Sequence, residues 1–357
     1  MDLKRALQTI LVLMSCSLCN FTGAQQRMVY IPENYAVKNV ETEFKADGPK
    51  LLFSDSPETV YNNGILYRDK VDGDVRLFLH HVNGRAENKK LAVVLKNTDS
   101  LRPIKYTIER RGEAAKAHNY LIDGKNAQKI YFDDSKQKPE IGQLGYENSK
   151  ELLSGRGVIL AADRLYTAII DMHFEKPVEI SVLMCETKSD IELFNESAAV
   201  LPMDEHPLRG TFENSNWHYT IKEPLSDLLE PVYIDLAGWQ EGYIKGIDAT
   251  TGKNAENYGN YGVVYEVNFT IAGDKPQSFI FNPIGGYFAG YGILENKTKK
   301  ERHLLALPEG RLSVGETVEE AVDLGALETG EYSFIWSPPG ASNLPVQLIW
   351  ESAGTNK

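Results

Sequence analysis

The 357-residue sequence contains only three cysteines, Cys16, Cys19 and Cys185. The first two lie in an N-terminal stretch that we expect to be removed. The mature chain would then keep Cys185 alone and have no intramolecular disulfide. Cys185 ends the apolar run 182–184, which indicates a buried small side chain and not a nucleophile. Stability must therefore come from the hydrophobic cores and from any bound ligand.

Basic residues are also scarce, with 38 Lys and Arg against 50 Asp and Glu and a formal net charge of −12. Nucleic-acid binding needs a basic footprint for the phosphates, so this balance argues against a nucleic-acid partner. The sequence also lacks an apolar run of the roughly 20 residues that a membrane-spanning helix needs. We therefore predict no transmembrane span.

The motifs of dedicated metal and catalytic sites are missing as well. There is no HExxH, His-x-His or CxxC for a metal ion, no GxSxG around a catalytic serine, and no phosphate-binding loop. Carboxylate pairs such as Asp134 with Glu140, or Asp204 with Glu205, occur in any acidic protein and carry almost no signal. The sequence predicts no catalytic residue, no metal ligand and no cofactor.

What the sequence does contain at its start is the pattern of a secretory signal peptide. Lys4 and Arg5 precede a mostly apolar run over residues 6–14, and small and polar residues follow as far as Ala24. We predict that residues 1–24 are removed and that the protein is secreted or held in the cell envelope, outside the cytoplasm. An alternative is a lipobox ending at Cys16, in which acylation of this cysteine would anchor the protein to a membrane.

Strand patterns dominate the rest of the first half. Alternating or continuous apolar segments predict strands at 74–82, 90–95, 104–110, 164–174 and 178–184. Asn83-Gly84 predicts a hairpin between the first two strands, and Lys176-Pro177 predicts another between the last two. Helices are predicted only at 125–132 and 190–200.

The strand pattern weakens between residues 187 and 231, where prolines recur, and then returns. Further strands are predicted at 232–236, 263–271, 277–281, 286–294, 332–336 and 346–350. We therefore predict an all-β fold with minor helix, built as two β-sandwich-like domains. Residues 25–204 would form the N-terminal β domain, and residues 205–357 a C-terminal β domain rich in Tyr and Gly.

The most unusual local pattern is the Tyr/Gly-rich run at residues 257–262. Exposed aromatic rings on Gly-rich loops offer contact area at low entropic cost together with a hydroxyl group, which suits sugar or peptide recognition. The candidate ligand-binding residues of this kind are Trp239, Tyr258, Tyr261, Tyr287 and Tyr291. The alternative is that the tyrosines pack the edges of the sandwich and the glycines only form turns.

A polar constellation is predicted from Asp55, Glu58, His80 and His81. Neighbouring residues of a strand point to opposite faces, so the two imidazoles would not ligate one metal ion together. We expect one buried, hydrogen-bonded histidine and one at the surface. We also expect one of them to lie beside Asp55 and Glu58, with its pKa raised by the carboxylates. The constellation would brace a turn against the sheet or, alternatively, form a metal or substrate site.

Three short motifs, Ser56-Pro57-Glu58, Gly64-Ile65-Leu66 and His80-His81, occur in this order. They resemble a family of exported bacterial proteins of unknown function, of a cyanobacterial type. The wider pattern continues through Asn282-Pro283 and Gly285-Gly286 to the segment 342–345. It resembles firmicute proteins that carry a copper amine oxidase N-terminal-type domain. The resemblance implies an envelope or extracellular protein and brings no known activity with it.

The name of that domain suggests an amine oxidase, but the residues argue against this activity. Such catalytic domains form a quinone from a Tyr in an Asn-Tyr-Asp/Glu context and hold copper with a His-x-His pair and a third His. Here Gly259 follows Asn257-Tyr258, and the sequence has no His-x-His. No catalytic residue is therefore carried over from the resemblance.

These observations together predict a non-catalytic exported protein of the cell envelope or surface that binds a glycan or a peptide. Its partner would be an envelope glycan or protein. The alternatives are an envelope polysaccharide hydrolase with carboxylates that the sequence does not reveal, and a purely structural surface-layer component.

Overall fold

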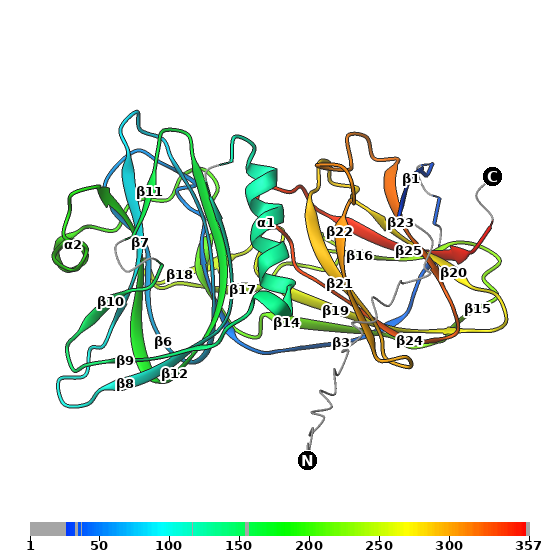
Figure 1. Ribbon diagram of the computed structural model, residues 1–357, viewed down its shortest axis with the longest axis horizontal. Coiled ribbons are helices and arrows are strands. Elements are labelled where there is room, and N and C mark those ends of the chain that lie inside the picture. The colour runs from blue at the N-terminus through cyan, green and yellow to red at the C-terminus, as the bar shows by residue number, and fades with distance from the viewer. Residues whose placement is uncertain (1–25, 33–34, 37, 116, 154–156, 355–357) are drawn as a thin grey trace, which may run out of the picture.

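The computed structural model describes residues 26–32, 35–36, 38–115, 117–153 and 157–354, which form a mostly β structure (Figure 1). These residues contain two α-helices, α1 (Tyr120–Phe132) and α2 (Ile191–Ser197), and a 3-10 helix at Asp134–Lys136. The strands form three mixed sheets. The predicted mostly-β class with little helix is confirmed. The predicted signal peptide, with Cys16, lies outside the described residues.

The largest sheet has twelve strands and lies on the left of Figure 1. Its main path, in spatial order, is β10 (Ser149–Glu151), β7 (Lys89–Lys96), β12 (Leu165–Glu186), β6 (Gly64–Asn83), β4 (Lys50–Ser54), β13 (Arg209–Phe212), β17 (Lys245–Asp248) and β18 (Lys253–Glu256). Four strands join this path from the side: β5 (Thr59–Val60), β8 (Ile104–Ala115), β9 (Glu140–Leu144) and β11 (Val158–Leu160).

The two longest strands fold this sheet over on itself. β6 and β12 pair antiparallel along almost their whole length, and the register shifts between Phe174 and Val178. Opposite the shift, Gly73 has a φ of +69°, a left-handed conformation that glycine adopts without a Cβ clash. Leu66 and Leu77 of β6 lie on either side of Gly73, and both are fully buried in the same core. One bent sheet thus encloses a hydrophobic core of its own.

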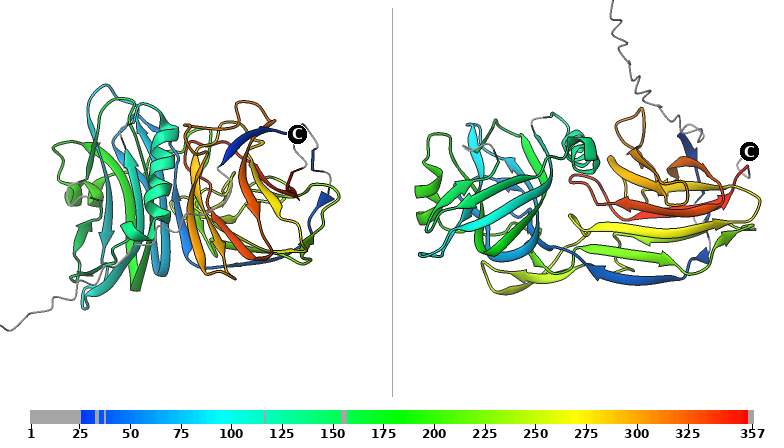
Figure 2. Two further views of the ribbon diagram at one scale, coloured as in Figure 1. Left: turned by 45° about the vertical axis from the view of Figure 1, so that its right-hand side comes forward. Right: turned by 60° about the horizontal axis from the view of Figure 1, so that its bottom comes forward.

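The other two sheets lie face to face on the right of Figure 1 and form two layers in the right-hand view of Figure 2. The six-stranded sheet has the order β1 (Arg27–Tyr30), β23 (Glu320–Leu327), β20 (Gln277–Asn282), β25 (Val346–Ser352), β16 (Val232–Leu236) and β2 (Lys38–Asn39). The seven-stranded sheet has the order β22 (Glu301–Leu307), β21 (Gly290–Asn296), β24 (Gly330–Trp336), β19 (Val264–Ala272), β14 (Asn216–Ile221) and β3 (Thr42–Asp47), and β15 (Leu225–Ser226) pairs with β19.

The core between these two sheets is aromatic and extends into the large sheet. Trp350 of the six-stranded sheet and Trp336 of the seven-stranded sheet are both fully buried in it. Phe53 and Phe78 of the large sheet belong to the same cluster, with their ring centroids 5.4 Å apart. Each fully buried aromatic ring contributes on the order of 2–3 kcal/mol of transfer free energy. The hydrophobic contact therefore joins both halves of the molecule.

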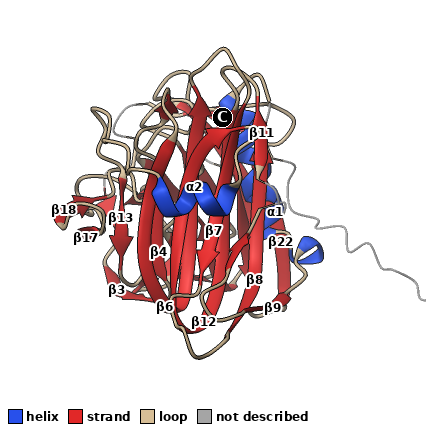
Figure 3. Cartoon of the chain, turned by 90° about the vertical axis from the view of Figure 1, so that its left-hand side faces the viewer, coloured by secondary structure: helices blue, strands red, loops and turns tan. Residues whose placement is uncertain are grey.

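The two helices lie on opposite sides of the folded large sheet, and both pack outside the core that the sheet encloses. α1 lies between the sheets in Figure 1, where its Tyr131 and Phe132 join the shared core. α2 crosses the outer face of the large sheet in Figure 3, and its Ile191 and Phe194 pack on Leu183 and Cys185. Asp190 caps α2 by accepting a hydrogen bond from the Leu193 amide. Both predicted helices are confirmed, and Cys185 is buried as expected.

Both predicted hairpins are wrong. β6 and β7 do not pair with each other, because β12 lies between them and pairs with both. Lys176-Pro177 lies inside β12 at the register shift, where a proline is tolerated because the backbone pairing is already interrupted. In both places a long-range partner provides more buried surface than the local turn would.

The predicted division of the chain at residues 204 and 205 does not coincide with the division between the sheets. β1, β2 and β3 come from the start of the chain but belong to the six- and seven-stranded sheets. β13, β17 and β18 come from beyond residue 205 but extend the large sheet. The existence of two separate folding units remains a prediction.

No helix in the described part of the chain is long and apolar enough to cross a membrane.

Candidate functional site

The segment 342–345, between β24 and β25, is the point at which several predicted residues meet. The Tyr261 hydroxyl donates to the Ser342 carbonyl at 2.9 Å, and the Asn343 amide donates to the Tyr287 carbonyl at 2.8 Å. The Gly285 amide donates to the Pro345 carbonyl at 3.0 Å. Two turns, the one around Tyr261 and the one that contains Gly285 and Tyr287, are thereby fixed to one short segment.

Glycines allow these turns to approach the 342–345 segment closely. A Cβ on Gly285 would lie 2.1 Å from the carbonyl group of Leu344, and one on Gly259 would lie 2.9 Å from its Cδ1 atom. Gly259 also has a φ of +97°, which side chains rarely tolerate. The glycines of the Tyr/Gly-rich pattern therefore have a packing role, and any side chain there would push the turns away.

The exposed aromatic side chains adjoin glycines that face this segment. Trp239 follows Gly238, Tyr258 precedes Gly259, and Tyr287 follows Gly286. These three side chains are 74%, 51% and 47% exposed, respectively. Tyr243 packs edge-on against Tyr258, with the ring centroids 5.4 Å apart. We call Trp239, Tyr243, Tyr258 and Tyr287 the aromatic rim.

The other two candidate tyrosines do not belong to the aromatic rim. The ring of Tyr261 stacks on Phe53 at 6.4 Å, and burial raises the pKa of its phenol, so this residue ties the 342–345 segment to the large sheet. Tyr291 lies beneath the ammonium groups of Lys125 and Lys129 of α1, at 5.9 and 5.8 Å from its ring centre. Three of the five predicted residues are thus exposed and adjoin glycines that pack on one segment.

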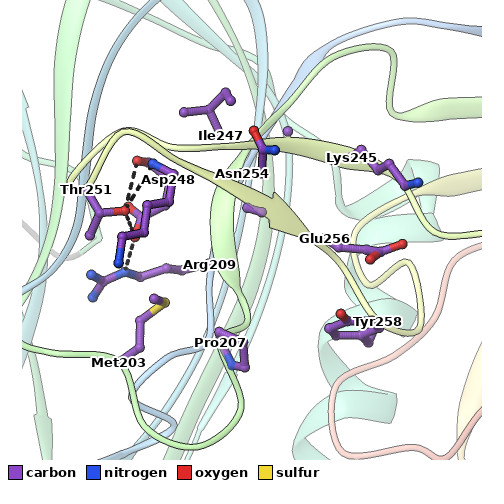
Figure 4. A pocket seen from close by; sticks show the side chains of 13 residues that line it. Met203, Pro207, Arg209, Lys245, Ile247, Asp248, Thr251, Asn254, Glu256 and Tyr258 are labelled. Atoms are coloured by element: carbon purple, nitrogen blue, oxygen red, sulfur yellow. Dashed lines mark hydrogen bonds and ion pairs between the residues drawn. The ribbon is translucent and has the colours of Figure 1, made fainter.

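A groove of about 610 Å³ begins at Tyr258 and runs along the β17–β18 hairpin (Figure 4). Its opposite wall is formed by Met203 and Pro207, from the loop that leads into β13. The side chains along it are mostly polar and include Lys245, Thr251, Lys253, Asn254 and Glu256. The groove therefore offers hydrogen-bond donors and acceptors next to an exposed aromatic ring.

The floor of the groove is held by a buried ion pair. The Arg209 Nε atom lies 3.2 Å from Asp248 Oδ2, and both side chains are 2% exposed. Arg209 Nη1 also donates to the carbonyls of Leu66 and Leu201, at 3.1 and 2.8 Å. Burial acts to raise the pKa of Asp248, but the Thr250 hydroxyl and the Arg209 charge outweigh it and lower the pKa. This satisfied network makes the floor rigid.

The predicted constellation is assembled in part, around the turn at residues 54–58. His81 bonds to the Ser54 hydroxyl at 2.8 Å and to the Pro57 carbonyl at 2.9 Å. Because a carbonyl only accepts, the imidazole donates from Nδ1 to Pro57. Burial keeps the ring neutral near pH 7, so Nε2 accepts the Ser54 proton. The ring thereby ties the turn to β6, which is the role that the structural alternative gave to the constellation.

Two details of that prediction are wrong. His80 and His81 are both buried, at 3% and 0% exposure, and neither is at the surface. Burial lowers the pKa of His80 to about 3 and of His81 to about 4, whereas a raised value was expected. Desolvation disfavours an imidazolium in both positions, and at His81 it outweighs the opposing effects of the Pro57 carbonyl and of Asp204. His80 lies on the opposite face from His81, next to Gly340 and Thr167.

Asp204 is the group that the sequence analysis missed. It accepts hydrogen bonds from the Ser56 hydroxyl and the Glu58 amide, both at 2.8 Å, and from the His206 amide at 3.1 Å. No local pattern connects residues 56 and 204, which are 148 positions apart. Asp204 brings a third carboxyl group beside Asp55 and Glu58.

We call Asp55, Glu58 and Asp204 the carboxyl cluster. Asp55 has the least favourable surroundings of the three. Its Oδ1 atom is buried and has no hydrogen-bond partner in the described structure. Burial, together with the charges of Glu58 and Asp204, raises the pKa of Asp55 well above its ordinary value. Burial and Asp204 also raise the pKa of Glu58. Both carboxyl groups act on the phenol of Tyr261, so the cluster adjoins the residue that fixes the 342–345 segment.

Within the described ranges, no group of three His, Cys, Asp or Glu side chains is arranged to hold a metal ion.

No family model and no curated protein matches the chain. Among solved structures, an oxalate decarboxylase from Lactobacillus farciminis is 8% identical over 86% of this chain and 87% of its own, with a TM-score of 0.17. An oxalate decarboxylase from Bacillus subtilis is 9% identical over 86% and 78%, again with a TM-score of 0.17. TM-scores this low do not establish a shared fold.

Proposed function

We propose that this chain is a non-catalytic exported protein of the cell envelope or surface, and that it binds a glycan through the aromatic rim and the adjoining groove. Export is supported by the signal-peptide pattern of residues 1–24 and by the resemblance to exported bacterial proteins. The lipid-anchored form, acylated at Cys16, belongs to the same proposal. So does the arrangement as two β-sandwich-like units.

One observation carries the binding proposal: exposed rings adjoin glycines that pack on one fixed segment, and one of these rings, Tyr258, lines a groove with several polar side chains. An aromatic face packs against the apolar face of a sugar ring, while nearby amide, hydroxyl and charged groups bond to its hydroxyls. Tyr258 supplies the ring, and Asn254, Thr251 and Glu256 supply the polar groups. Because turns and a bonded network hold these groups, little conformational entropy is lost on binding.

The experiment is a glycan array and a pull-down from envelope fractions with the full mature chain. We expect Tyr258→Ala to weaken binding at least tenfold, since truncation of a central aromatic contact removes more than about 1.4 kcal/mol. The matched control is Tyr146→Ala, because Tyr146 is 66% exposed on a loop away from the rim. Absence of any glycan ligand in both assays would refute the proposal. Capture of a peptide ligand, or ordered self-assembly, would instead support the peptide-binding or surface-layer alternative.

The carboxyl cluster favours a second candidate, an envelope polysaccharide hydrolase. A carboxyl group kept protonated beside an ionised one is the arrangement that glycoside hydrolysis uses. Asp55 and Glu58 have raised pKa values, and three donors surround Asp204. Release of reducing ends from envelope polysaccharide by the wild-type chain, and its loss in Glu58→Gln, would support this function. Unchanged release in the variant would exclude Glu58 as the acid.

A further inference from the structure

The loop 237–244 carries half of the aromatic rim, Trp239 and Tyr243, directly after β16 ends. Inside the loop, the Gly242 amide donates to the Gly238 carbonyl at 3.2 Å. Ala237 has a φ of +58°, an uncommon conformation for a residue with a side chain. Contacts from outside the loop must therefore hold this turn against its strain.

The Glu241 side chain reaches back from the loop into the core, where it bonds to two tyrosines outside the loop and to the first amide of the loop itself. Its carboxyl oxygens accept hydrogen bonds from the Tyr219 hydroxyl, from the Tyr265 hydroxyl at 3.2 Å, and from the Ala237 amide at 2.6 Å. Tyr219 and Tyr265 belong to neighbouring strands, β14 and β19, and their rings stack at 6.3 Å. One carboxyl group thus fixes the strained start of the loop to the seven-stranded sheet.

Asn260 provides the contacts at the end of the loop. Its side-chain oxygen accepts from the Ile244 amide at 2.8 Å, and its nitrogen donates to the Gly242 carbonyl at 3.2 Å and to the Tyr265 hydroxyl at 2.8 Å. Asn260 lies two residues beyond Tyr258, whose ring packs on Tyr243. Tyr265 therefore links Glu241, Asn260 and both turns of the aromatic rim in one network.

We propose that Glu241 and Asn260 are positioning residues for the aromatic rim, and that the protonation state of Glu241 sets how firmly the loop 237–244 is docked. This inference rests on the proposed function, because the rim is the surface assigned there to glycan binding. Neither residue is exposed as the rim is, and neither is expected to touch the ligand.

The electrostatics of Glu241 give the direction of the pH dependence. Burial raises the pKa of Glu241 to about 7. The titratable groups that face it are Tyr219 on β14, Tyr265 on β19 and Tyr243 in the loop, and Glu256 also acts on Tyr243. Among the described residues, no Lys, Arg or His forms an ion pair with Glu241. Ionisation of this carboxyl is therefore not compensated by a cation.

The docked loop binds a proton more tightly than a released loop, whose carboxyl would titrate near 4.5. Docking is therefore strongest below pH 4.5, weakens as the pH rises toward about 7, and is weakest above it. The difference between the two pKa values corresponds to a change in the docking equilibrium on the order of 100-fold.

Hydrogen exchange on the full mature chain tests this inference without a ligand. We expect the protection of the Ala237, Gly242 and Ile244 amides, corrected for the intrinsic pH dependence of exchange, to fall by at least tenfold between pH 5 and pH 8. The Asn343 amide, which bonds outside the loop, should not follow. Glu241→Gln should remove the pH dependence and leave the fold intact. The control Glu113→Gln, which alters a Tyr–carboxyl contact with Tyr166 elsewhere, should retain it.

Protection that is independent of pH in the wild type, or that titrates equally in Glu241→Gln, would overturn the inference. Asn260→Asp gives a second reading: it replaces the donor to Gly242 and should lower loop protection at all pH values. If glycan binding is found, its affinity should fall over the same pH window in the wild type but not in Glu241→Gln. A titrating loop in a chain that binds no glycan would instead refute the proposed function and leave the Glu241 contacts as a loop anchor.

Discussion

Two buried charged sites adjoin the turn at residues 54–58, and they differ in how their charges are compensated. Arg209 and Asp248 form an ion pair, and the guanidinium also bonds to backbone carbonyls, including that of Ser56 at 3.5 Å. Asp55, the residue before Ser56, has a buried Oδ1 atom without a partner and two further carboxyl groups nearby. In the first site each charge is compensated by its partner, whereas in the second an ionised Asp55 has no such compensation. Groups maintained at such an energetic disadvantage are candidates for function.

The largest effect should come from breaking the satisfied pair. Arg209→Met leaves Asp248 buried without its cation and removes donors from the Leu66 and Leu201 carbonyls. We expect the free energy of unfolding to fall by about 3–5 kcal/mol, measured by urea denaturation. The control Arg85→Met removes an exposed pair with Glu87 and should change stability by less than about 1 kcal/mol. Equal losses in the free energy of unfolding would show that the buried pair contributes no more to stability than the exposed pair.

The next effect separates the members of the carboxyl cluster. Asp204→Ala removes the acceptor for Ser56, for the Glu58 amide and for the His206 amide, and should cost about 2–3 kcal/mol. Glu58 contributes only its backbone amide to these bonds, so Glu58→Ala should change stability by less than about 1 kcal/mol. Thermal melting with and without a chelator checks both variants. A larger loss in Glu58→Ala, or sensitivity of the wild type to chelators, would contradict the assignment of the brace to Asp204.

At Asp55 we expect a smaller change in the free energy of unfolding, and here the substitution should raise stability. Its raised pKa means that the folded protein binds a proton more tightly than the unfolded chain. The free energy of unfolding should therefore fall as the pH rises above about 4. Asp55→Asn should remove this slope and exceed the wild type at pH 8 by about 1–2 kcal/mol. Urea denaturation between pH 4 and pH 8 measures it, with the exposed Asp274→Asn as control. A steeper slope in Asp55→Asn would show that the unpartnered oxygen is not the cause.

The smallest effect on stability should come from the rim itself. Tyr258 is 51% exposed and packs mainly on Tyr243, so Tyr258→Ala should lower the free energy of unfolding by no more than about 1 kcal/mol. Together with a loss of glycan binding, this result would separate the surface for recognition from the network that supports it. A loss of several kcal/mol would place Tyr258 in the core instead.

Local patterns predicted the elements well and their pairing poorly. Residues 232–236 coincide with β16, and 125–132 and 190–200 contain most of α1 and α2, because alternation and capping are local signals. The first hairpin failed because β12 takes the place expected for β7, and the Asn83 side chain bonds to the Glu87 and Leu160 carbonyls. The second failed because β12 continues through Lys176-Pro177. A turn motif predicts that the chain reverses locally, but it does not determine which strands then pair with each other.

The residues of the candidate site likewise fall into two groups, those that a local sequence pattern indicates and those that it does not. The positions of Trp239, Tyr258 and Tyr287 beside glycines are visible in the sequence, whereas the exposure of their rings is a finding of the structure, and their role in binding stays a prediction. Asp204, Arg209 and Glu241 could not be predicted from the sequence, because their roles depend on partners far along the chain or on burial. Glu241 has no sequence motif around it. Its carboxyl group has its contacts because β14 and β19 pair and place Tyr219 and Tyr265 next to it.

The strands at the start of the chain have a consequence for the order of folding. β1 pairs with β23, and Arg27 bonds to Asp323, 296 positions later. A ribosome adds about 5–20 residues per second, so this strand waits many seconds for its partner. Although β1 is synthesised long before β23, it is therefore among the last strands to find its place, and a nascent chain lacking β23 leaves a strand without its partner. We expect such truncated chains to depend on chaperones or to aggregate, whereas in the completed chain that strand pairs with β23.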